Sequence, residues 1–246
     1  RMDRAEWRKT LITGSAGTVQ VAAACATAGI VVGVASLTGI GLRMSELIIT
    51  VAQGHLPVAL LLTALGSIVI GMGLPTTAAY VVLAALGAPA LTELGVPLLA
   101  AHLFIFYYGC MSNVTPPVAL AAYAAAGLAG SSPLRTGATA MGLAVGGFLV
   151  PFAFIYDPFL LLSGTVFEIL ATALGAAIGV TSLAAGIVGY IGRPISVSGR
   201  AILVAAGIAL LAPGWPSDGL GMAIFAAALW LWRKPEGKLE SAQQAH

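Results

Sequence analysis

Two polar motifs interrupt the most apolar part of this 246-residue chain. The first reads Gly-Met-Gly-Leu-Pro-Thr-Thr over residues 71–77, and the second reads Ser-Asn-Val-Thr-Pro-Pro over residues 112–117. Glycine and proline interrupt helices and so free main-chain carbonyl and amide groups, while the hydroxyl and amide side chains add further oxygens. Hard cations prefer oxygen ligands, and unwound carbonyls hold Na⁺ in transporters with broken helices. The motifs therefore predict an ion site made of neutral oxygens.

The same motifs also predict binding of an anion. An apolar segment follows each of them, so we expect new helices to begin at Pro75–Thr77 and at Pro116–Pro117. A helix N-terminus carries partial positive charge, which suits the carboxylate of an organic acid. A site that takes a cation and an anion without fixed charge is suited to coupled transport. The alternative interpretation is that Gly and Pro only kink an ordinary helix bundle, because both are common in membrane helices.

The candidate ligand residues are those of the two motifs. They are Gly71, Met72, Gly73, Pro75, Thr76, Thr77, Ser112, Asn113, Thr115, Pro116 and Pro117. For Na⁺ we expect carbonyls near Gly71, Gly73 and Ser112 and the hydroxyls of Thr76 and Thr115. We expect no cofactor besides Na⁺ as the coupling ion. Two cysteines, Cys25 and Cys110, lie in apolar segments and are expected to pack as small residues.

Short apolar segments position the first motif. Residues 56–70 and 78–91 contain no charged side chain. As a helix, each would reach about 22 Å at about 1.5 Å per residue, which is less than the roughly 30 Å of a bilayer's hydrocarbon core. We therefore expect a re-entrant helical hairpin over residues 56–91. The second motif interrupts residues 97–129 and predicts a broken helix there.

Composition places the whole chain in a membrane. Hydrophobic residues make up 59% of it and charged residues only 8%, whereas soluble domains carry about 25% charged residues. No cluster of Lys and Arg supports a nucleic-acid partner. We expect an all-α polytopic fold of about six spans plus the hairpin and the broken helix. In order, these are a surface lead-in (1–17), a span (18–42), an interfacial helix (43–53), the hairpin (56–91), the broken helix (97–129), a span (136–156), C-terminal spans (163–234) and a polar tail (235–246).

The distribution of charge predicts an orientation. The positive-inside rule places the basic segment 1–10 in the cytoplasm. If the hairpin returns to its own side, both termini are cytoplasmic, and two full crossings in its place would give the same result. The arginines of later loops then also lie inside, at Arg135, Arg193 and Arg200, while Asp157 and Asp218 lie outside. Arg43 is the exception.

The two motifs resemble those of a known family. Residues 71–77, followed by Ser-Asn-Val-Thr-Pro-Pro-Val-Ala-Leu at 112–120, are similar to the large membrane subunit of TRAP transporters, and more closely to the fused permeases of the TAXI type. The segments 123–130 and 148–158 agree with this. The resemblance covers about residues 10–162.

The resemblance implies a Na⁺-driven importer of organic acids in a bacterial inner membrane, with substrate delivered by a periplasmic binding protein. It implies an elevator-type fold of two inverted repeats, each with a hairpin and a broken helix. Residues 18–162 would be the second repeat. The first repeat is not in this sequence, so we expect a C-terminal half whose partners include the remainder of the permease.

Two other functions stay open. One is a structural membrane subunit that does not transport. The other is an intramembrane hydrolase, which needs a nucleophile within hydrogen-bond reach of a base. His102 and Ser112 would lie about 15 Å apart along one helix, which argues against such a pair. We therefore expect no enzymatic activity.

Overall fold

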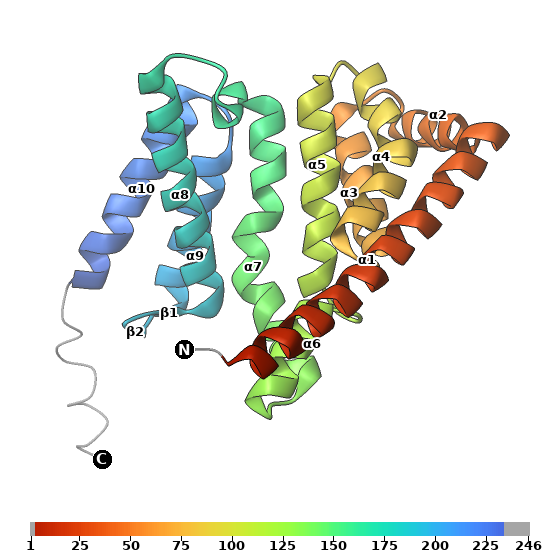
Figure 1. Ribbon diagram of the computed structural model, residues 1–246. Coiled ribbons are helices and arrows are strands. Elements are labelled where there is room, and N and C mark those ends of the chain that lie inside the picture. The colour runs from red at the N-terminus through yellow and green to blue at the C-terminus, as the bar shows by residue number, and fades with distance from the viewer. Residues whose placement is uncertain (1–2, 234–246) are drawn as a thin grey trace. The chain divides into compact units, whose positions relative to one another are not determined.

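The computed structural model describes residues 3–233, and these form helices apart from short connections and one small hairpin (Figure 1). The helices are α1 Arg4–Thr38, α2 Ile40–Ala52, α3 Leu56–Gly71, α4 Thr76–Glu93, α5 Leu98–Met111, α6 Leu120–Ala129, α7 Pro133–Tyr156, α8 Val166–Val188, α9 Val197–Leu211 and α10 Trp215–Arg233, with 3₁₀ turns η1 Ser112–Val114 and η2 Pro158–Leu161. Strands β1 (Tyr190–Ile191) and β2 (Arg193–Pro194) pair in antiparallel fashion. The all-helical prediction is confirmed apart from these strands. The side chains of Cys25 and Arg193, and the predicted tail 235–246, lie outside the described part.

Three of the described helices are long and apolar enough to cross a membrane, namely α4, α7 and α8. Residues Gly29–Ala35 and Ile40–Ala52 pass the same test together, although they are bent by 72°. The total of about six spans stays a prediction. Helix α4 has 18 residues and is longer than the segment 78–91 suggested, so its length does not by itself prevent it from crossing. The re-entrant course of the hairpin therefore also stays a prediction.

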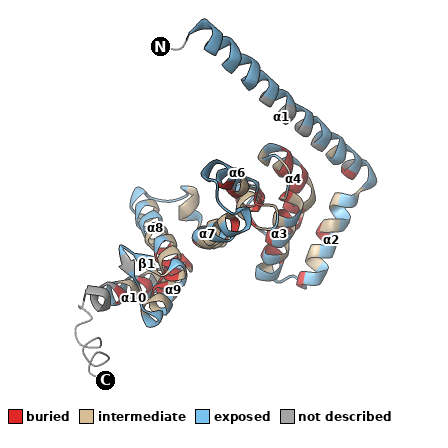
Figure 2. Ribbon diagram, turned by 90° about the horizontal axis from the view of Figure 1, so that it is seen from below, coloured by how far each residue is buried: buried red, intermediate tan, exposed pale blue. Residues whose placement is uncertain are grey.

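Helix α1 is continuous across the expected boundary between the lead-in and the first span. It begins at a capping box in which Asp3 and Glu6 each accept from the other's main-chain amide. It ends at Thr38 and not at Leu42, because Gly39 has a left-handed φ of +68°. Residues 40–42 consequently belong to α2. Most of α1 is exposed (Figure 2).

The residues up to Ala140 form one compact unit. Helices α3 and α4 pack against each other and against α5, and α2 packs on both α3 and α4. The largest side chains in this core are fully buried, and they are Leu60, Leu91, Phe104 and Ile105. Figure 2 shows the buried residues gathered on the inner faces of α3 and α4. This core holds the two polar motifs, because each motif begins at the end of one of its packed helices.

The residues from Met141 form a second unit. Helices α8 and α9 approach closely at glycines: a Cβ on Gly207 would lie 2.7 Å from the Gly179 carbonyl oxygen. The end of α8 is capped by Arg200, whose Nε donates to the Gly186 carbonyl at 2.9 Å. Its Nη2 donates to the Ile187 carbonyl at 2.7 Å. The guanidinium thus satisfies carbonyls that a helix end leaves without partners.

Acidic residues gather at the other end of this unit. Asp157, Glu168 and Asp218 line one cavity of about 270 Å³. Asp218 precedes the apolar run of α10, and burial, with a contribution from the Asp157 carboxylate, raises the pKa of its carboxyl group. Asp157 and Asp218 therefore lie together, at the end of α8 opposite to Arg200. This agrees with the predicted separation of charges, while the side of the membrane stays a prediction.

We predict that Gly207→Ala destabilises the second unit. The added methyl group would overlap the Gly179 carbonyl of α8 and force the helices apart. Overpacking of this kind costs about 1–3 kcal/mol. Gly175→Ala in α8 is the control, since a Cβ there meets nothing within 4 Å. Thermal unfolding of the purified protein in detergent measures the stability of both variants. Equal melting temperatures for Gly207→Ala and Gly175→Ala would contradict the predicted close packing.

Candidate functional site

The first motif separates α3 from α4. Helix α3 ends at Gly71 and α4 begins at Thr76, so the intervening residues 72–75 are not helical. Gly73 has a φ of +81°, which glycine adopts without steric cost. The Leu74 amide donates to the Gly71 carbonyl at 3.3 Å and closes a tight turn. Thr76 is half-buried and Thr77 exposed. The turn therefore leaves the Thr76 side chain partly covered by the protein and the Thr77 side chain exposed.

The second motif separates α5 from α6. Helix α5 ends at Met111, η1 continues it for one turn, and an irregular segment with a cis Pro116–Pro117 bond follows. The expected helix start at Pro116–Pro117 is wrong: α6 begins at Leu120. Thr115 is extended, because a residue before proline disfavours the helical region. Ala119, with a φ of +34°, lies outside the right-handed helical region. The interruption is consequently longer than the sequence predicts.

Gly71 and Ser112 bring the two motifs together. A Cβ on Gly71 would lie 2.9 Å from the Ser112 Oγ and 3.3 Å from the Gly109 carbonyl oxygen. Helix α3 therefore ends directly against the start of η1. Thr76 and Thr77 are not joined to the second motif by any hydrogen bond among the described residues. The contact between the motifs thus runs through the carboxyl ends of α3 and α5.

The polar side chains of the second motif donate to carbonyls of α5. The Ser112 Oγ donates to the Gly109 carbonyl at 2.6 Å, and the Thr115 Oγ1 donates to the Met111 carbonyl at 2.7 Å. The Asn113 Nδ2 donates to the Cys110 carbonyl at 3.3 Å. Ser112 and Thr115 are buried. With their protons engaged, these side-chain oxygens keep lone pairs that can accept from a donor or coordinate a cation.

The helices that follow the motifs have no side-chain caps. Pro75 precedes α4 and Ala119 precedes α6, and neither side chain accepts from the first turn. The first amides of a helix have no partner within it, so they can donate to an anion. Neither motif contains a titratable side chain. The arrangement is suited to binding charged solutes and not to proton transfer.

Tyr123 is a structural residue of this region that the motifs did not reveal. Its Oη donates to the Pro117 carbonyl at 2.7 Å, which fixes the irregular segment to α6. Its ring lies against α7, because a Cβ on Gly137 would lie 3.0 Å from the Tyr123 Cε1. The sequence placed Tyr123 only in a segment that supports the family resemblance. No local pattern predicts a contact to a carbonyl six residues earlier.

The geometry lacks the pair that a serine hydrolase needs. The His102 Nδ1 lies 3.0 Å from the Tyr80 Oη, and the Tyr80 ring also meets Phe106 edge-on. The Ser112 hydroxyl donates to the Gly109 carbonyl. No hydrogen bond among the described residues joins Ser112 to a histidine. Within residues 3–233, no base therefore lies in hydrogen-bond contact with this serine.

Comparison with known proteins identifies a family. The model of a family described as the tripartite ATP-independent periplasmic transporter, DctM component, matches residues 1–169, which include both motifs. No curated protein matches the chain, and no solved structure does.

We predict that Gly71→Ala separates the two motifs. Its methyl group would overlap the Ser112 Oγ, and the nearby Gly109 carbonyl leaves it little room to shift. Thermal unfolding of the purified protein should show a loss of about 1–3 kcal/mol. In the control Gly127→Ala on α6, a Cβ meets nothing within 4 Å, and Ala favours a helix over Gly by about 1 kcal/mol. A Gly71→Ala protein as stable as the control would refute the tight contact.

Proposed function

This chain belongs to the family of the DctM component of tripartite ATP-independent periplasmic transporters, and we propose that it holds the Na⁺ and organic-acid site of its permease. It is an integral membrane component of a transporter and not an enzyme. The observation that carries the proposal is the contact of Gly71 with Ser112, which joins two uncharged helix interruptions.

The Na⁺ ions would bind at the carboxyl ends of α3 and α5. Carbonyls near Gly71, Gly73 and Ser112 carry the partial negative charge of helix C-termini. The Thr115 hydroxyl supports this role, because its proton is donated to the Met111 carbonyl and its lone pairs remain. The Thr76 hydroxyl would complete the shell from the other side of the turn. Neutral oxygens suffice, since carbonyls from unwound helices hold Na⁺ in other transporters.

The organic acid would bind through its carboxylate to the uncapped amides of α4 and α6. Met72, Pro75, Thr77, Pro116 and Pro117 would shape the site around it. Asn113 would offer its side-chain amide to the substrate or its carbonyl to the ion. Bound Na⁺ would raise the affinity for the acid by lying near its carboxylate. Binding of the ion and binding of the acid would thereby be coupled.

The movement that carries the solute would be of the elevator type. The unit of α3, α4 and α5 has its own buried core, so it can move as one body with the site inside it. In this proposal α3 and α4 form a re-entrant hairpin, and the chain is the second of two inverted repeats. The remainder of the permease would supply the first repeat.

The family match supports a proposal for the cellular setting. We propose a TAXI-type fused permease in a bacterial inner membrane, with both termini cytoplasmic and with substrate delivered by a periplasmic binding protein. A structural membrane role without transport, the alternative that the sequence leaves open, is the competing function.

We predict that Thr115→Val and Asn113→Ala abolish Na⁺-dependent uptake by the complete permease in proteoliposomes. Each change removes one oxygen from the proposed site and preserves membrane insertion. Thr139→Val is the matched control, because the Thr139 hydroxyl makes the same type of bond, to the Arg135 carbonyl at 2.9 Å, on an exposed face. Unchanged Na⁺ dependence in both site variants would refute the site assignment without affecting membership of the family.

We also predict that this chain by itself does not accumulate organic acids in proteoliposomes, whereas the complete permease does so when the Na⁺ gradient and the binding protein are present. The reason is that an elevator-type site needs a scaffold and a second repeat against which to move. Uptake of a labelled dicarboxylate or monocarboxylate panel measures this. Failure of the complete permease under a Na⁺ gradient would favour the structural role.

A further inference from the structure

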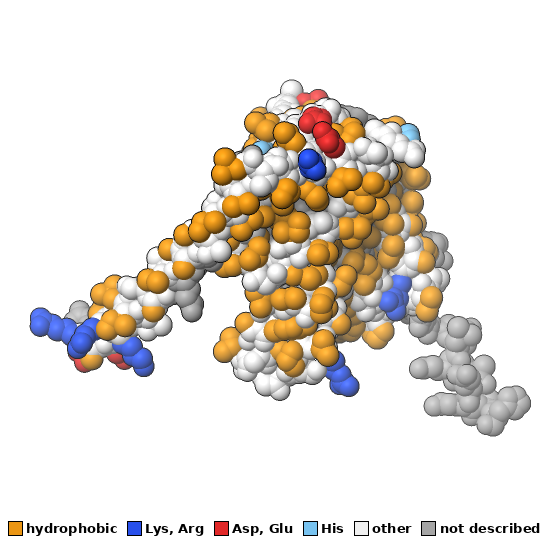
Figure 3. All heavy atoms as spheres, turned by 90° about the vertical axis from the view of Figure 1, so that its right-hand side faces the viewer, with side chains coloured by type: hydrophobic (Ala, Val, Ile, Leu, Met, Phe, Trp, Pro, Cys, Tyr) orange, Lys and Arg blue, Asp and Glu red, His pale blue; other side chains and the backbone are white. Residues whose placement is uncertain are grey.

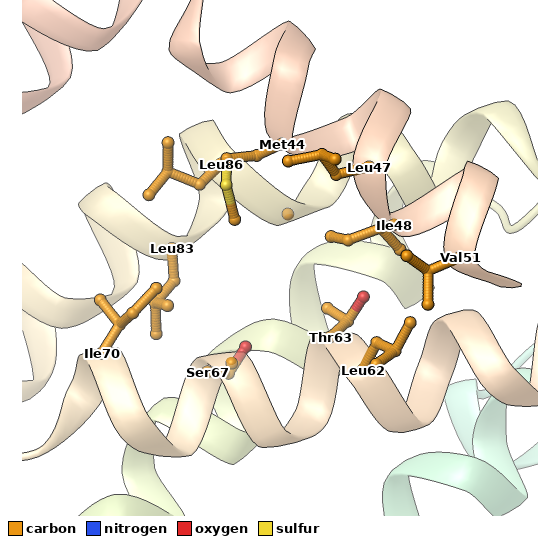
Figure 4. Close-up of a pocket in the computed structure, with 12 residues that line it drawn as sticks. Met44, Leu47, Ile48, Val51, Leu62, Thr63, Ser67, Ile70, Leu83 and Leu86 are labelled. Carbon is orange, nitrogen blue, oxygen red and sulfur yellow. The ribbon is translucent and has the colours of Figure 1, made fainter.

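A cavity between α2, α3 and α4 lies apart from the two motifs. It has a volume of about 230 Å³ and is lined mainly by aliphatic side chains, among them Met44 and Ile48 of α2, Leu62 of α3 and Leu86 of α4 (Figure 4). Typical pockets for drug-sized ligands measure about 300–1,000 Å³, so this one is suited to part of a longer molecule. One water takes about 30 Å³, and water does not fill a cavity that is mostly apolar.

The hydroxyl of Thr63, a residue that lines this cavity, has no hydrogen-bond partner among the described residues. Thr63 is 4% exposed, and its Oγ1 makes no hydrogen bond. Figure 4 shows the hydroxyls of Thr63 and Ser67 on the side of α3 that faces α2. An unsatisfied buried hydroxyl costs about 1–3 kcal/mol, which an acceptor group on a ligand would recover. The ligand that best matches this lining is therefore a hydrocarbon that carries a hydrogen-bond acceptor.

The rim of the cavity is continuous with the apolar surface of the helices. Leu47 and Val51 line it and are 58% and 61% exposed. Exposed aliphatic residues continue this surface along the outer face of α3, at Leu61, Leu65 and Val69. Figure 3 shows that hydrophobic side chains cover much of the helix surface on one side of the molecule. Where this surface faces lipid, acyl chains have direct access to the cavity.

Arg43 supplies the charge that a lipid headgroup would pair with. It is exposed and lies one helical turn before Leu47 on the same face of α2. An arginine pairs with phosphate through two parallel hydrogen bonds. Arg43 was also the one basic residue that the positive-inside rule did not explain. A phosphate bound at this position would account for it.

We propose that this cavity binds a phospholipid acyl chain, with the ester carbonyl accepting a hydrogen bond from the Thr63 hydroxyl and the phosphate near Arg43. The acyl chain would pack between α2 and the pair formed by α3 and α4. Because the cavity reaches Ile70, one residue before the turn at Gly71, the lipid would also support the end of α3. The proposal does not depend on which solute is carried.

The test uses the complete permease in nanodiscs with a phosphatidylethanolamine that carries a photoreactive diazirine in one acyl chain. Mass spectrometry measures labelling of α2 and α3 peptides relative to labelling of the exposed helix α1. Gly66→Leu should lower this ratio about fivefold or more, because Gly66 lines the cavity and a Cβ there meets nothing within 4 Å. Gly127→Leu on α6 is the matched control and should leave the ratio unchanged.

A second variant tests the hydrogen bond. Thr63→Val keeps the side-chain shape and removes the hydroxyl, so it should lower labelling by the diester probe about two- to tenfold. Labelling by the diether analogue, which has no ester carbonyl, should not change. Equal labelling of Gly66→Leu and the unmodified protein would overturn the proposal. An equal effect of Thr63→Val on both probes would overturn it too, as would protein–protein cross-links showing that another segment of the permease fills the cavity.

Discussion

The constraint on which this structure depends is that main-chain groups inside a membrane must find partners when a helix is interrupted. Here the ends of α3 and α5 meet, and the side chains of η1 donate to carbonyls in the last turn of α5. The amides at the starts of α4 and α6 stay uncapped by side chains. The protein therefore partly satisfies the main chain at the interruptions, and the remaining amides are available to the solute of the proposed site.

Glycines set how closely the helices approach. At Gly71 the missing side chain lets α3 reach η1, and at Gly207 it lets α9 reach the main chain of α8. Helices in lipid gain no hydrophobic energy from association, so close packing and hydrogen bonds hold them together. The same principle makes the cavity at Thr63 informative, because its lining is mainly aliphatic and the buried Thr63 hydroxyl has no hydrogen-bond partner.

The sequence predicted those features that depend on local chemistry. The interruption after Gly71 and the break at Ser112 follow from Gly and Pro, and α7 and α8 begin within a few residues of their predicted starts. It did not predict the start of α6, because the conformation of Ala119 depends on the fold of the segment before it. It also did not predict the bond of Tyr123 to Pro117, which closes a segment without a regular repeat.

The sequence alone therefore determined that this is a membrane protein of the TRAP transporter family, made of apolar helices with two uncharged interruptions, since hydropathy and helix breaking act over a few residues. The tertiary structure alone decided that Gly71 lies against Ser112, that Asp157 meets Asp218, and that Thr63 faces a cavity. Each of these joins positions far apart in the chain or on different helices. Such contacts depend on helix direction and packing, which side-chain size and crossing geometry set and which no local pattern records.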